Sequence, residues 1–496
     1  MFEKILIANR GEIAVRVMRA CREMGIAAVG VYSEADRSAR HVRYADEAYE
    51  IGPPPSSQSY LLIDRIIQTA KTAGCQAIHP GYGFLAENPD LASACESEGI
   101  VFIGPNSAAM ELVGDKTKAR STIEKAGIPI IPGVKEPLSD PEVAVSEAEK
   151  VGYPIMLKAA GGGGGKGVRI VNRTEEMADA LERARSEAMS SFGNPDIYLE
   201  KYVVKPRHVE IQILADNHGN VIHLNERECS IQRRYQKLIE ESPSCALNEE
   251  LRRAMGEAAV KSAKASGYSN AGTVEFLVDA DRNFYFLEVN ARLQVEHPVT
   301  ELITGIDLVK QQVRISAGEK LEISQDEIGI NGAAIECRIC AEDPRTFFPS
   351  TGIIEELVEP AGPGVRIESG IHAGFEVSVY YDPLIAKLIT WGQNREEAVA
   401  RMQRALEEYK IKGIQTTIPF HQKALVYKPF LEGNYDTSTV TEIEHEQTEQ
   451  HIEIGAIAAT MVAMDEETVG FQTGAEECDN WKMTGRLNYG LHRLNW

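Results

Sequence analysis

Long hydrophobic runs are missing from this chain of 496 residues. A helix that crosses a membrane needs about 20 consecutive, mostly apolar residues, so we expect no membrane insertion. The opening residues MFEKILIANRGE also lack the basic, apolar and small-residue regions of a signal peptide. The sequence therefore predicts a soluble protein located in the cytoplasm.

Basic residues are too few for a typical nucleic-acid-binding protein. The chain has 52 Lys and Arg residues against 74 Asp and Glu residues, which gives a formal net charge of −22. A nucleic acid is held mainly through a basic surface that contacts its phosphates. We therefore expect no nucleic-acid partner, while local basic sites for small anions remain open.

Cysteine is scarce as well, with eight residues spread over the whole chain, so a disulfide framework is not expected. Cys337 and Cys340 form one CxxC motif within AIECRIC. This segment alternates like a strand, which would direct the two side chains to opposite faces. Since no second pair accompanies them, we interpret both as buried thiols rather than zinc ligands.

The first 113 residues alternate between strand and helix patterns. The apolar residues 5–8 end at Asn9-Arg10-Gly11, helical spacing continues to Met24, and Gly25 ends the helix. A similar unit follows at residues 63–84. Such alternation predicts a doubly wound parallel sheet. The turn NRGEIA holds one of the three glycines of a dinucleotide fingerprint, so we exclude NAD binding there.

Five consecutive glycines, residues 161–165, stand between two apolar, strand-like runs in YPIMLKAAGGGGGKGVRIV. They form either a flexible linker or a loop whose backbone N–H groups approach phosphates closely. The loop is not a Walker A motif, because Ala160 and Gly167 stand where that motif needs Gly and Ser or Thr. Lys158, just before the loop, and Lys116 are candidate partners for phosphate charge.

A β-hairpin is predicted at residues 273–290, TVEFLVDADRNFYFLEVN. A turn at residues 280–283 would pair Asp279 with Phe284 and place Glu275 directly opposite Glu288. Two like charges in that arrangement repel, and a divalent cation such as Mg²⁺ between them would remove the repulsion. Asn290 follows on the same face as Glu288 and would add an amide ligand.

Polar residues occupy every second position of FLEVNARLQVEHP, residues 286–298. An extended chain would place all of them on one face, which is either exposed to solvent or part of a site. The predicted metal position beside a glycine-rich loop favours a site for a metal-bound nucleotide. The residues are Glu288, Asn290, Arg292, Gln294 and Glu296.

The length predicts about two to four domains. After residue 330, the runs AAIECRIC, VRIESGI and LIAKLITWG read as strands and REEAVARMQRALEEY as a helix, which suggests a further α+β domain over residues 331–445. The final residues, 446–496, contain one short apolar helix candidate at 454–464. This segment could dock a partner or pack on the body of the protein.

Several long motifs, taken together and in this order, resemble biotin carboxylase, the ATP-grasp component of biotin-dependent carboxylases. They are KILIANRGEIA, AIHPGYGFLAEN, KAAGGGGGKGVRIV, EKYVVKPRHVEIQ, ERECSIQRRYQKLIEESPS, FLEVNARLQVEHPVTE and YYDPLIAKLITWG. The resemblance covers residues 1 to about 440 but not the last fifty. It implies an α/β fold with an N-terminal domain (1–113), an ATP-grasp domain (114–330) with a mobile glycine-rich lid at about 133–203, and a C-terminal domain (331–445).

The resemblance also implies roles for individual residues. Nucleotide contacts would come from Lys116, Lys158, the lid residues Gly164 and Gly165, the hinge Glu200, Lys201, Tyr202 and Val203, and from His208, Gln232 and Tyr235. Glu275, Glu288 and Asn290 match metal-binding positions. Arg292, Gln294 and Val295 match the bicarbonate pocket, Lys237 the lysine near the γ-phosphate, Glu296 the base and Arg338 the residue facing biotin. Tyr235 departs from the family, which often has His there, so that contact is in question.

The implied substrates and cofactors are ATP, Mg²⁺ or Mn²⁺, bicarbonate and biotin. The tripeptide Met-Lys-Met of the biotin attachment site is absent from the 496 residues, so we expect the biotin on a separate carrier protein. A carboxyltransferase subunit would use the carboxybiotin, for example in an acetyl-CoA carboxylase, and we expect a homodimer. The alternatives are another ATP-grasp ligase and a nucleotide-binding regulator without catalysis. The intact Lys237, Glu296 and Arg338 argue against the regulator.

Overall fold

The computed structural model describes residues 1–134, 136–159 and 168–443. Gly164, Gly165 and the apolar segment 454–464 lie outside these residues, so the predictions for the lid glycines and the tail stay untested. No helix in the described ranges is long and apolar enough to cross a membrane.

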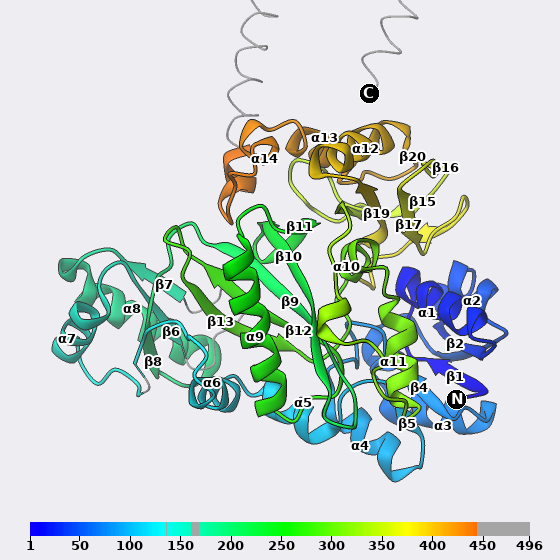
Figure 1. Cartoon of the computed structure of the whole chain (residues 1–496), viewed down its shortest axis with the longest axis horizontal. Coiled ribbons are helices and arrows are strands. Elements are labelled where there is room, and N and C mark those ends of the chain that lie inside the picture. Colours follow the sequence, from blue (N-terminus) through cyan, green and yellow to red (C-terminus); the bar gives the residue numbers. More distant parts are fainter. Residues whose placement is uncertain (135, 160–167, 444–496) are drawn as a thin grey trace, which may run out of the picture. The chain divides into compact units, whose positions relative to one another are not determined.

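The N-terminal part is a five-stranded parallel sheet in the order β3-β2-β1-β4-β5, shown in blue in Figure 1. Ile5 and Ile7 pack with residues of α1, whereas Leu6 and Ala8 pack with residues of α3 on the opposite face. Helices on both faces of a parallel sheet confirm the predicted doubly wound arrangement. The elements are β1 (Lys4–Ile7), α1 (Gly11–Glu23), β2 (Ala27–Ser33), a 3₁₀ turn (Glu34–Asp36), α2 (Arg40–Tyr44), β3 (Glu47–Gly52), a 3₁₀ turn (Ser56–Gln58), α3 (Ile63–Ala73), β4 (Ala77–His79), α4 (Pro89–Ser97) and β5 (Val101–Phe102).

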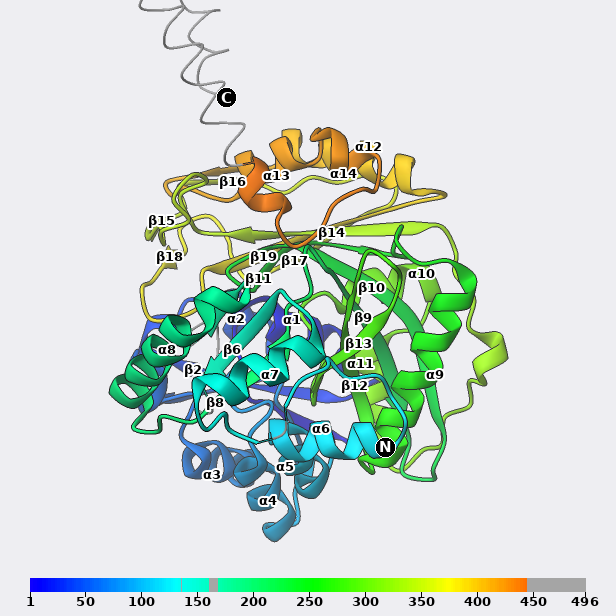
Figure 2. The ribbon, with the colours of Figure 1, turned by 90° about the vertical axis from the view of Figure 1, so that its left-hand side faces the viewer.

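A smaller three-stranded antiparallel sheet, β7-β6-β8, carries the residues that flank the glycine run. The strands on either side of the glycines, β6 and β7, pair with each other as antiparallel neighbours. Helices α7 and α8 pack on this sheet through a small core of their own. Figure 2 shows the ribbon of these elements in cyan to green. The elements here are α5 (Ser107–Gly114), α6 (Lys116–Lys125), α7 (Pro141–Val151), β6 (Ile155–Ala159), β7 (Val168–Val171), a 3₁₀ turn (Thr174–Glu176), α8 (Met177–Phe192) and β8 (Ile197–Lys201).

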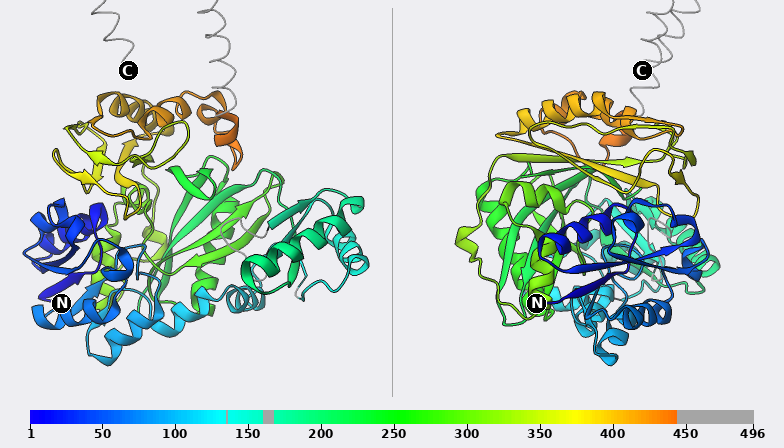
Figure 3. Two further views of the ribbon diagram at one scale, coloured as in Figure 1. Left: turned by 180° about the vertical axis from the view of Figure 1, so that it is seen from behind. Right: turned by 90° about the vertical axis from the view of Figure 1, so that its right-hand side faces the viewer.

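An eight-stranded antiparallel sheet in the order β13-β12-β9-β10-β11-β14-β19-β17 lies between these two parts (Figure 3, left). It continues across residue 330, because β14 pairs with β11. Its first strands and nearby helices are β9 (Arg207–Ala215), β10 (Val221–Arg233), β11 (Gln236–Ser242), α9 (Glu249–Ala265), β12 (Asn270–Val278), β13 (Phe284–Asn290), α10 (His297–Thr304), α11 (Leu308–Ser316) and a 3₁₀ turn (Gln325–Glu327).

The strands and the helix predicted after residue 330 are all present. Helix α12 packs on β14 and β19 through Met402 and Leu406, and Cys337 and Cys340 are both buried, as predicted. The right-hand view of Figure 3 shows the helices above these strands. The elements are β14 (Ala333–Cys340), β15 (Gly352–Ile353), β16 (Glu356–Val358), β17 (Val365–Ser369), β18 (Glu376–Val377), β19 (Leu384–Gly392), α12 (Arg395–Glu408), β20 (Lys410–Lys412), α13 (Ile418–Ala424) and α14 (Lys428–Leu431).

The predicted hairpin forms, with one correction to its register. Glu275 does lie opposite Glu288, but Phe284 pairs with Val278 and not with Asp279. A β-bulge next to Glu275 leaves Leu287 without a partner across the strands and takes up the extra residue. The bulge therefore restores the predicted pairing of the two glutamates.

The predicted extended segment to Glu296 is also corrected. Strand β13 ends at Asn290, and Glu296 stands immediately before helix α10. The side chains that follow Asn290 are therefore placed by an irregular loop, not by a strand face. Arg292 nevertheless contacts Gln294 directly, and Gln294 is linked to Glu296 through Glu275 and Lys237.

Candidate active site

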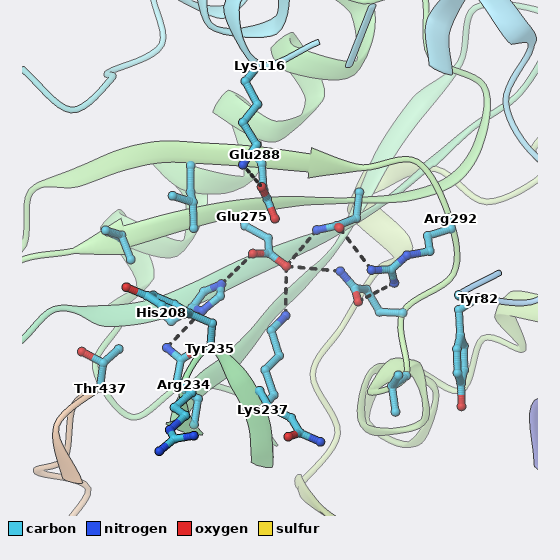
Figure 4. A pocket seen from close by; sticks show the side chains of 18 of the residues that line it. Tyr82, Lys116, His208, Arg234, Tyr235, Lys237, Glu275, Glu288, Arg292 and Thr437 are labelled. Atoms are coloured by element: carbon cyan, nitrogen blue, oxygen red, sulfur yellow. Dashed lines mark hydrogen bonds and ion pairs between the residues drawn. The ribbon is translucent and has the colours of Figure 1, made fainter. Parts of the chain in front are cut away.

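A cavity of about 1790 Å³ is lined by residues from every described part of the chain. Its wall includes Tyr82 from the N-terminal part, Lys158 from β6, His208 from β9 and Arg338 from β14. Ligand sites commonly measure about 300–1,000 Å³, so this cavity has room for more than one small substrate. Figure 4 shows part of its wall.

All predicted site residues in the described ranges, except Glu296, line this cavity. They are Lys116, Lys158, Glu200, Lys201, Tyr202, Val203, His208, Gln232, Tyr235, Lys237, Glu275, Glu288, Asn290, Arg292, Gln294, Val295 and Arg338. Glu296 is fully buried and joins this wall through ion pairs with two of these residues.

Lys237 lies at the centre of the charged groups. Its Nζ atom donates to Glu210 at 2.5 Å, Glu275 at 2.9 Å and Glu296 at 2.7 Å. Burial alone would lower the pKa of Lys237, but the three carboxylates raise it well above the usual value. The lysine is therefore a fixed cation that holds three strands and the loop before α10 together.

Glu275 uses both carboxylate oxygens. Oε1 accepts hydrogen bonds from Lys237, from Asn290 at 2.8 Å and from Gln294 at 3.2 Å, and Oε2 lies 2.8 Å from Nε2 of His208 (Figure 4). Burial would raise the pKa of Glu275, but Lys237 and His208 hold it well below the usual range. Glu275 therefore stays ionised.

Glu296 is held between two cations. Oε1 accepts from Lys237, and Oε2 accepts from Arg338 at 3.0 Å. Burial favours the protonated acid, yet the positive charges of Lys237 and Arg338 keep the pKa of Glu296 well below its usual value. A carboxylate that is ionised, buried and adjacent to the cavity can accept a proton from a bound substrate.

Arg292 orders the loop between β13 and α10. Its guanidinium donates to Oε1 of Gln294 at 2.8 Å and Oδ1 of Asn290 at 3.2 Å, and its Nε lies 3.1 Å from Glu87. Glu87 also accepts the backbone N–H of Ala291 at 3.0 Å. The loop is thus fixed to the N-terminal part of the chain, with polar groups facing the cavity.

Glu288 is better suited to bind a metal ion than Glu275, the residue opposite it. Its side chain is 42% exposed, and among the described residues its one ion-pair contact is with Lys116 at 4.0 Å, so its oxygens are accessible. Partial burial and the nearby charge of Glu275 both raise the pKa of Glu288. A divalent cation would relieve this repulsion, although Glu275 would have to share oxygens that already accept protein hydrogen bonds.

Two further groups of side chains have the spacing of metal ligands, but a lysine already occupies the space between them. His208, Glu210 and Glu275 form one group, and Glu210, Cys229 and Glu296 form the other. The ammonium of Lys237 contacts Glu210, which belongs to both groups, so it takes the place that a cation would need. Burial raises the pKa of Cys229 well above the usual value, so its thiol stays protonated.

Glu200 and its neighbours form the wall on the β6–β8 side. Its carboxylate accepts hydrogen bonds from Lys158 and Arg120. Lys201 donates to the carbonyl oxygens of Gly152 at 2.8 Å and Tyr153 at 3.0 Å. Lys158 and Arg120 therefore supply the positive charge near this wall, while the ammonium of Lys201 is bound to the backbone.

Tyr235 lies at the turn between β10 and β11. Arg234 and Tyr235 have φ angles of 49° and 68°, in the left-handed region that residues with a side chain rarely adopt. Both side chains line the cavity, and Tyr235 is 68% exposed. In Figure 4 both side chains are drawn on the same side of the pocket as His208 and Thr437.

Sequence reasoning missed the buried residues that support Lys237 and Arg338. Arg227, which is fully buried, donates to Glu210 at 2.5 Å and Gln212 at 2.6 Å, and Arg338 donates to Glu240 at 2.6 Å. The segment RHVEIQ alternates polar and apolar residues like FLEVN, and that signal could have identified Glu210 and Gln212. The residue types alone could not show that Arg227 turns inward.

Comparisons with known proteins agree over nearly the whole described chain. Residues 1–110 match the N-terminal domain family of biotin carboxylase, residues 336–442 match its C-terminal domain family, and residues 115–324 match the ATP-binding domain of the carbamoyl-phosphate synthase L chain. The last match together with the solved structures confirms the predicted ATP-grasp fold.

Individual relatives agree over the same range. One subunit of the pyruvate carboxylase of Methanothermobacter thermautotrophicus is 56% identical over 443 residues, covering 89% of this chain and 90% of that protein. Biotin carboxylase 1 of Bacillus subtilis is 54% identical over 439 residues, covering 88% and 98%. The biotin carboxylase domain dimer of Hydrogenobacter thermophilus 2-oxoglutarate carboxylase, solved with MgADP, ADP and bicarbonate, superposes with a TM-score of 0.83 at 51% identity, covering 90% and 98%. The chain therefore belongs to the biotin carboxylase family of ATP-dependent ligases.

Proposed function

We propose that this chain carboxylates biotin carried by a separate protein, using ATP and bicarbonate, as the first half-reaction of a biotin-dependent carboxylase. The observation that carries the proposal is Glu296, an ionised base held between Lys237 and Arg338, which both line a cavity large enough for several substrates. A site that only bound a nucleotide would not need a buried base beside the nucleotide position.

We assign the nucleotide to the side of the cavity formed by β6, β8 and β9. Lys116 and Lys158 would contact its phosphates, and its adenine and ribose would lie along Glu200 to Val203, His208, Gln232 and Tyr235. Gly164 and Gly165 would cover the phosphates. Mg²⁺, held by Glu288, Glu275 and Asn290, would neutralise the phosphate charge when bound.

The first chemical step would join bicarbonate to the γ-phosphoryl group. Arg292, Gln294 and the backbone of Val295 orient bicarbonate, and Glu296 takes its O–H proton. A bicarbonate oxygen then forms a bond to the γ-phosphorus while the bond to the bridging β–γ oxygen breaks, which gives carboxyphosphate and ADP. Phosphoryl transfer depends mainly on positioning and charge stabilisation, and Lys237 supplies a fixed positive charge for both.

In the second step, carboxyphosphate breaks at its C–O bond to give CO₂ and phosphate. Phosphate takes the N1′ proton of biotin, and N1′ forms a bond to CO₂. Negative charge develops on the ureido oxygen, and Arg338 supplies the directional cation for it. Arginine is suited to this role because its guanidinium stays protonated and offers several donors in a fixed plane.

The molecule that accepts the carboxyl group is selected by a carboxyltransferase partner. We propose acetyl-CoA, pyruvate and 2-oxoglutarate as acceptors to be tested. The similar proteins named above belong to carboxylases that act on different substrates, pyruvate in one case and 2-oxoglutarate in another. We also propose a homodimer, in keeping with the dimer of the Hydrogenobacter domain. We also propose that the domain boundaries lie at residues 113 and 330.

The direct test is ADP release by the purified chain with MgATP, measured with and without bicarbonate and free biotin. We expect ADP release to require bicarbonate and to become faster when biotin is added. ADP release that ignores biotin but depends on another acceptor, such as ammonia, would favour a different ATP-grasp ligase.

Replacement of Glu288 by glutamine should weaken metal binding. We expect the Mg²⁺ concentration for half-maximal ADP release to rise by roughly tenfold or more, which corresponds to about 1.4 kcal/mol. In the absence of Mg²⁺ the variant should unfold at no lower a temperature than the parent protein, because the substitution also removes repulsion from Glu275. Glu250→Gln, at an exposed position in the first turn of α9, is the matched control. An unchanged Mg²⁺ requirement in Glu288→Gln would contradict the metal assignment.

A further inference from the structure

Lys387, on strand β19, is fully buried. Its Nζ atom donates a hydrogen bond of 2.8 Å to the backbone carbonyl of Val295, the residue immediately before Glu296. Lys387 is also the direct neighbour of Arg338 across β14 and β19, so the two side chains share a face of the sheet. Two adjacent cations thus hold two consecutive residues, since Arg338 binds the side chain of Glu296 and Lys387 binds the backbone before it.

Glu12 faces Lys387 from the N-terminal part of the chain. Its Oε2 atom lies 3.4 Å from Nζ of Lys387, and among the described residues no other cation lies within ion-pair distance of Glu12. Glu12 is only 4% exposed, and burial raises its pKa to about 7, with Lys387 opposing this shift and Glu368 adding to it. An ionisable group in so unfavourable a place costs stability, which indicates that its contact with Lys387 serves another purpose.

The pair joins three segments that are distant in the sequence. Glu12 lies in the first turn of helix α1, Lys387 belongs to β19, and Val295 lies in the loop between β13 and α10. Both Glu12 and Val295 line the cavity. There is no spare room at this junction, because a Cβ atom on Gly370 would lie 2.7 Å from the backbone nitrogen of Glu12.

We propose that Lys387 is a positioning residue for the pocket that takes bicarbonate, with Glu12 holding the lysine in place. A peptide group is planar, so a hydrogen bond that fixes the carbonyl of Val295 also fixes the N–H of Glu296 and the direction in which both residues leave the loop. Misplacement of a reacting group by about 1 Å can lower a rate by about a hundredfold. The inference rests on the proposed function, since it assigns a role within that bicarbonate pocket.

The test compares Glu12→Gln with the double variant Glu12→Gln/Lys387→Met. Glutamine keeps the shape of Glu12 but removes the carboxylate nearest to Lys387, while Glu336 and Glu368 still face the lysine. The double variant removes this less well compensated charge together with the donor to Val295, so it should be at least as stable as Glu12→Gln. Its KM for bicarbonate should nevertheless be about tenfold higher or more, because the carbonyl of Val295 has lost its partner.

From Glu12→Gln to the double variant, stability should therefore not decrease, whereas the affinity for bicarbonate should decrease. A purely structural role for Lys387 would not produce this combination. The KM for ATP should stay within about twofold in both variants, and Lys412→Met, at an exposed ion pair of β20 with Glu356, should change neither KM. A double variant with the same bicarbonate KM as Glu12→Gln, or with an equal rise in both KM values, would overturn the inference while leaving the proposed function intact. If the parent protein shows no bicarbonate-dependent ADP release, the proposed function has failed and this inference fails with it.

Discussion

Replacement of Glu296 by alanine should lower bicarbonate-dependent ADP release and carboxybiotin formation together, each by about 10²- to 10⁴-fold. The reason is that Glu296 acts before CO₂ exists, so both products depend on the proton it removes. Its low pKa means that nearly all of it is ionised at neutral pH and ready to accept that proton. Both activities can be measured in one reaction, as ADP by a coupled assay and carboxybiotin from labelled bicarbonate.

Arg338→Ala is the matched comparison, because Arg338 acts later, on biotin. It should reduce carboxybiotin formation more strongly than bicarbonate-dependent ADP release. Loss of Arg338 also removes one of the two cations that Glu296 contacts, but Lys237 remains at 2.7 Å and keeps the carboxylate ionised. Equal losses of both activities in the two variants would contradict this division of roles.

Lys237→Met should cause the second large effect, on folding as well as on turnover. Removal of the shared cation leaves Glu210, Glu275 and Glu296 buried without it, and breaking a buried ion pair typically costs about 3–5 kcal/mol of folding free energy. We expect a loss of this size in the free energy of unfolding, measured by denaturant titration, together with loss of ADP release.

The control for this substitution is Lys71→Met, which removes an exposed ion pair with Glu98. An exposed pair contributes about 0–1 kcal/mol, so this variant should unfold close to the parent protein. If Lys237→Met were as stable as Lys71→Met, the three carboxylates would not depend on the lysine in the way described. Partial recovery of stability in Lys237→Met/Glu210→Gln would support the account, since one buried charge is then removed.

Much of the site could be predicted from the sequence because local patterns placed its residues. Period-two alternation and a short polar turn identified the hairpin, and the pairing of Glu275 with Glu288 followed from counting along the strands. The count succeeded only because the bulge at Leu287 compensates for a turn that begins one residue earlier than expected. A bulge depends on packing on both sides of the sheet, and the sequence of the hairpin does not reveal it.

The buried ion pairs were harder to predict. Arg227 lies on strand β10 between two glutamates that are also buried, and only the folded sheet shows that its guanidinium turns toward Glu210. Glu296 was predicted as one member of an extended polar face, but β13 ends at Asn290 and the loop brings Glu296 to Lys237 by another route. Contacts between distant segments decide such positions, and no local period encodes them.

The formation of carboxyphosphate is the central claim, and oxygen transfer from bicarbonate to phosphate tests it most directly. The reaction would be run briefly with ¹⁸O-labelled bicarbonate, MgATP and free biotin, and the phosphate would be analysed by mass spectrometry. Attack of a bicarbonate oxygen on the γ-phosphorus, followed by cleavage of the C–O bond, predicts one ¹⁸O atom in each phosphate formed together with carboxybiotin. Phosphate without the label would mean that water, and not bicarbonate, attacks ATP, and would contradict the account.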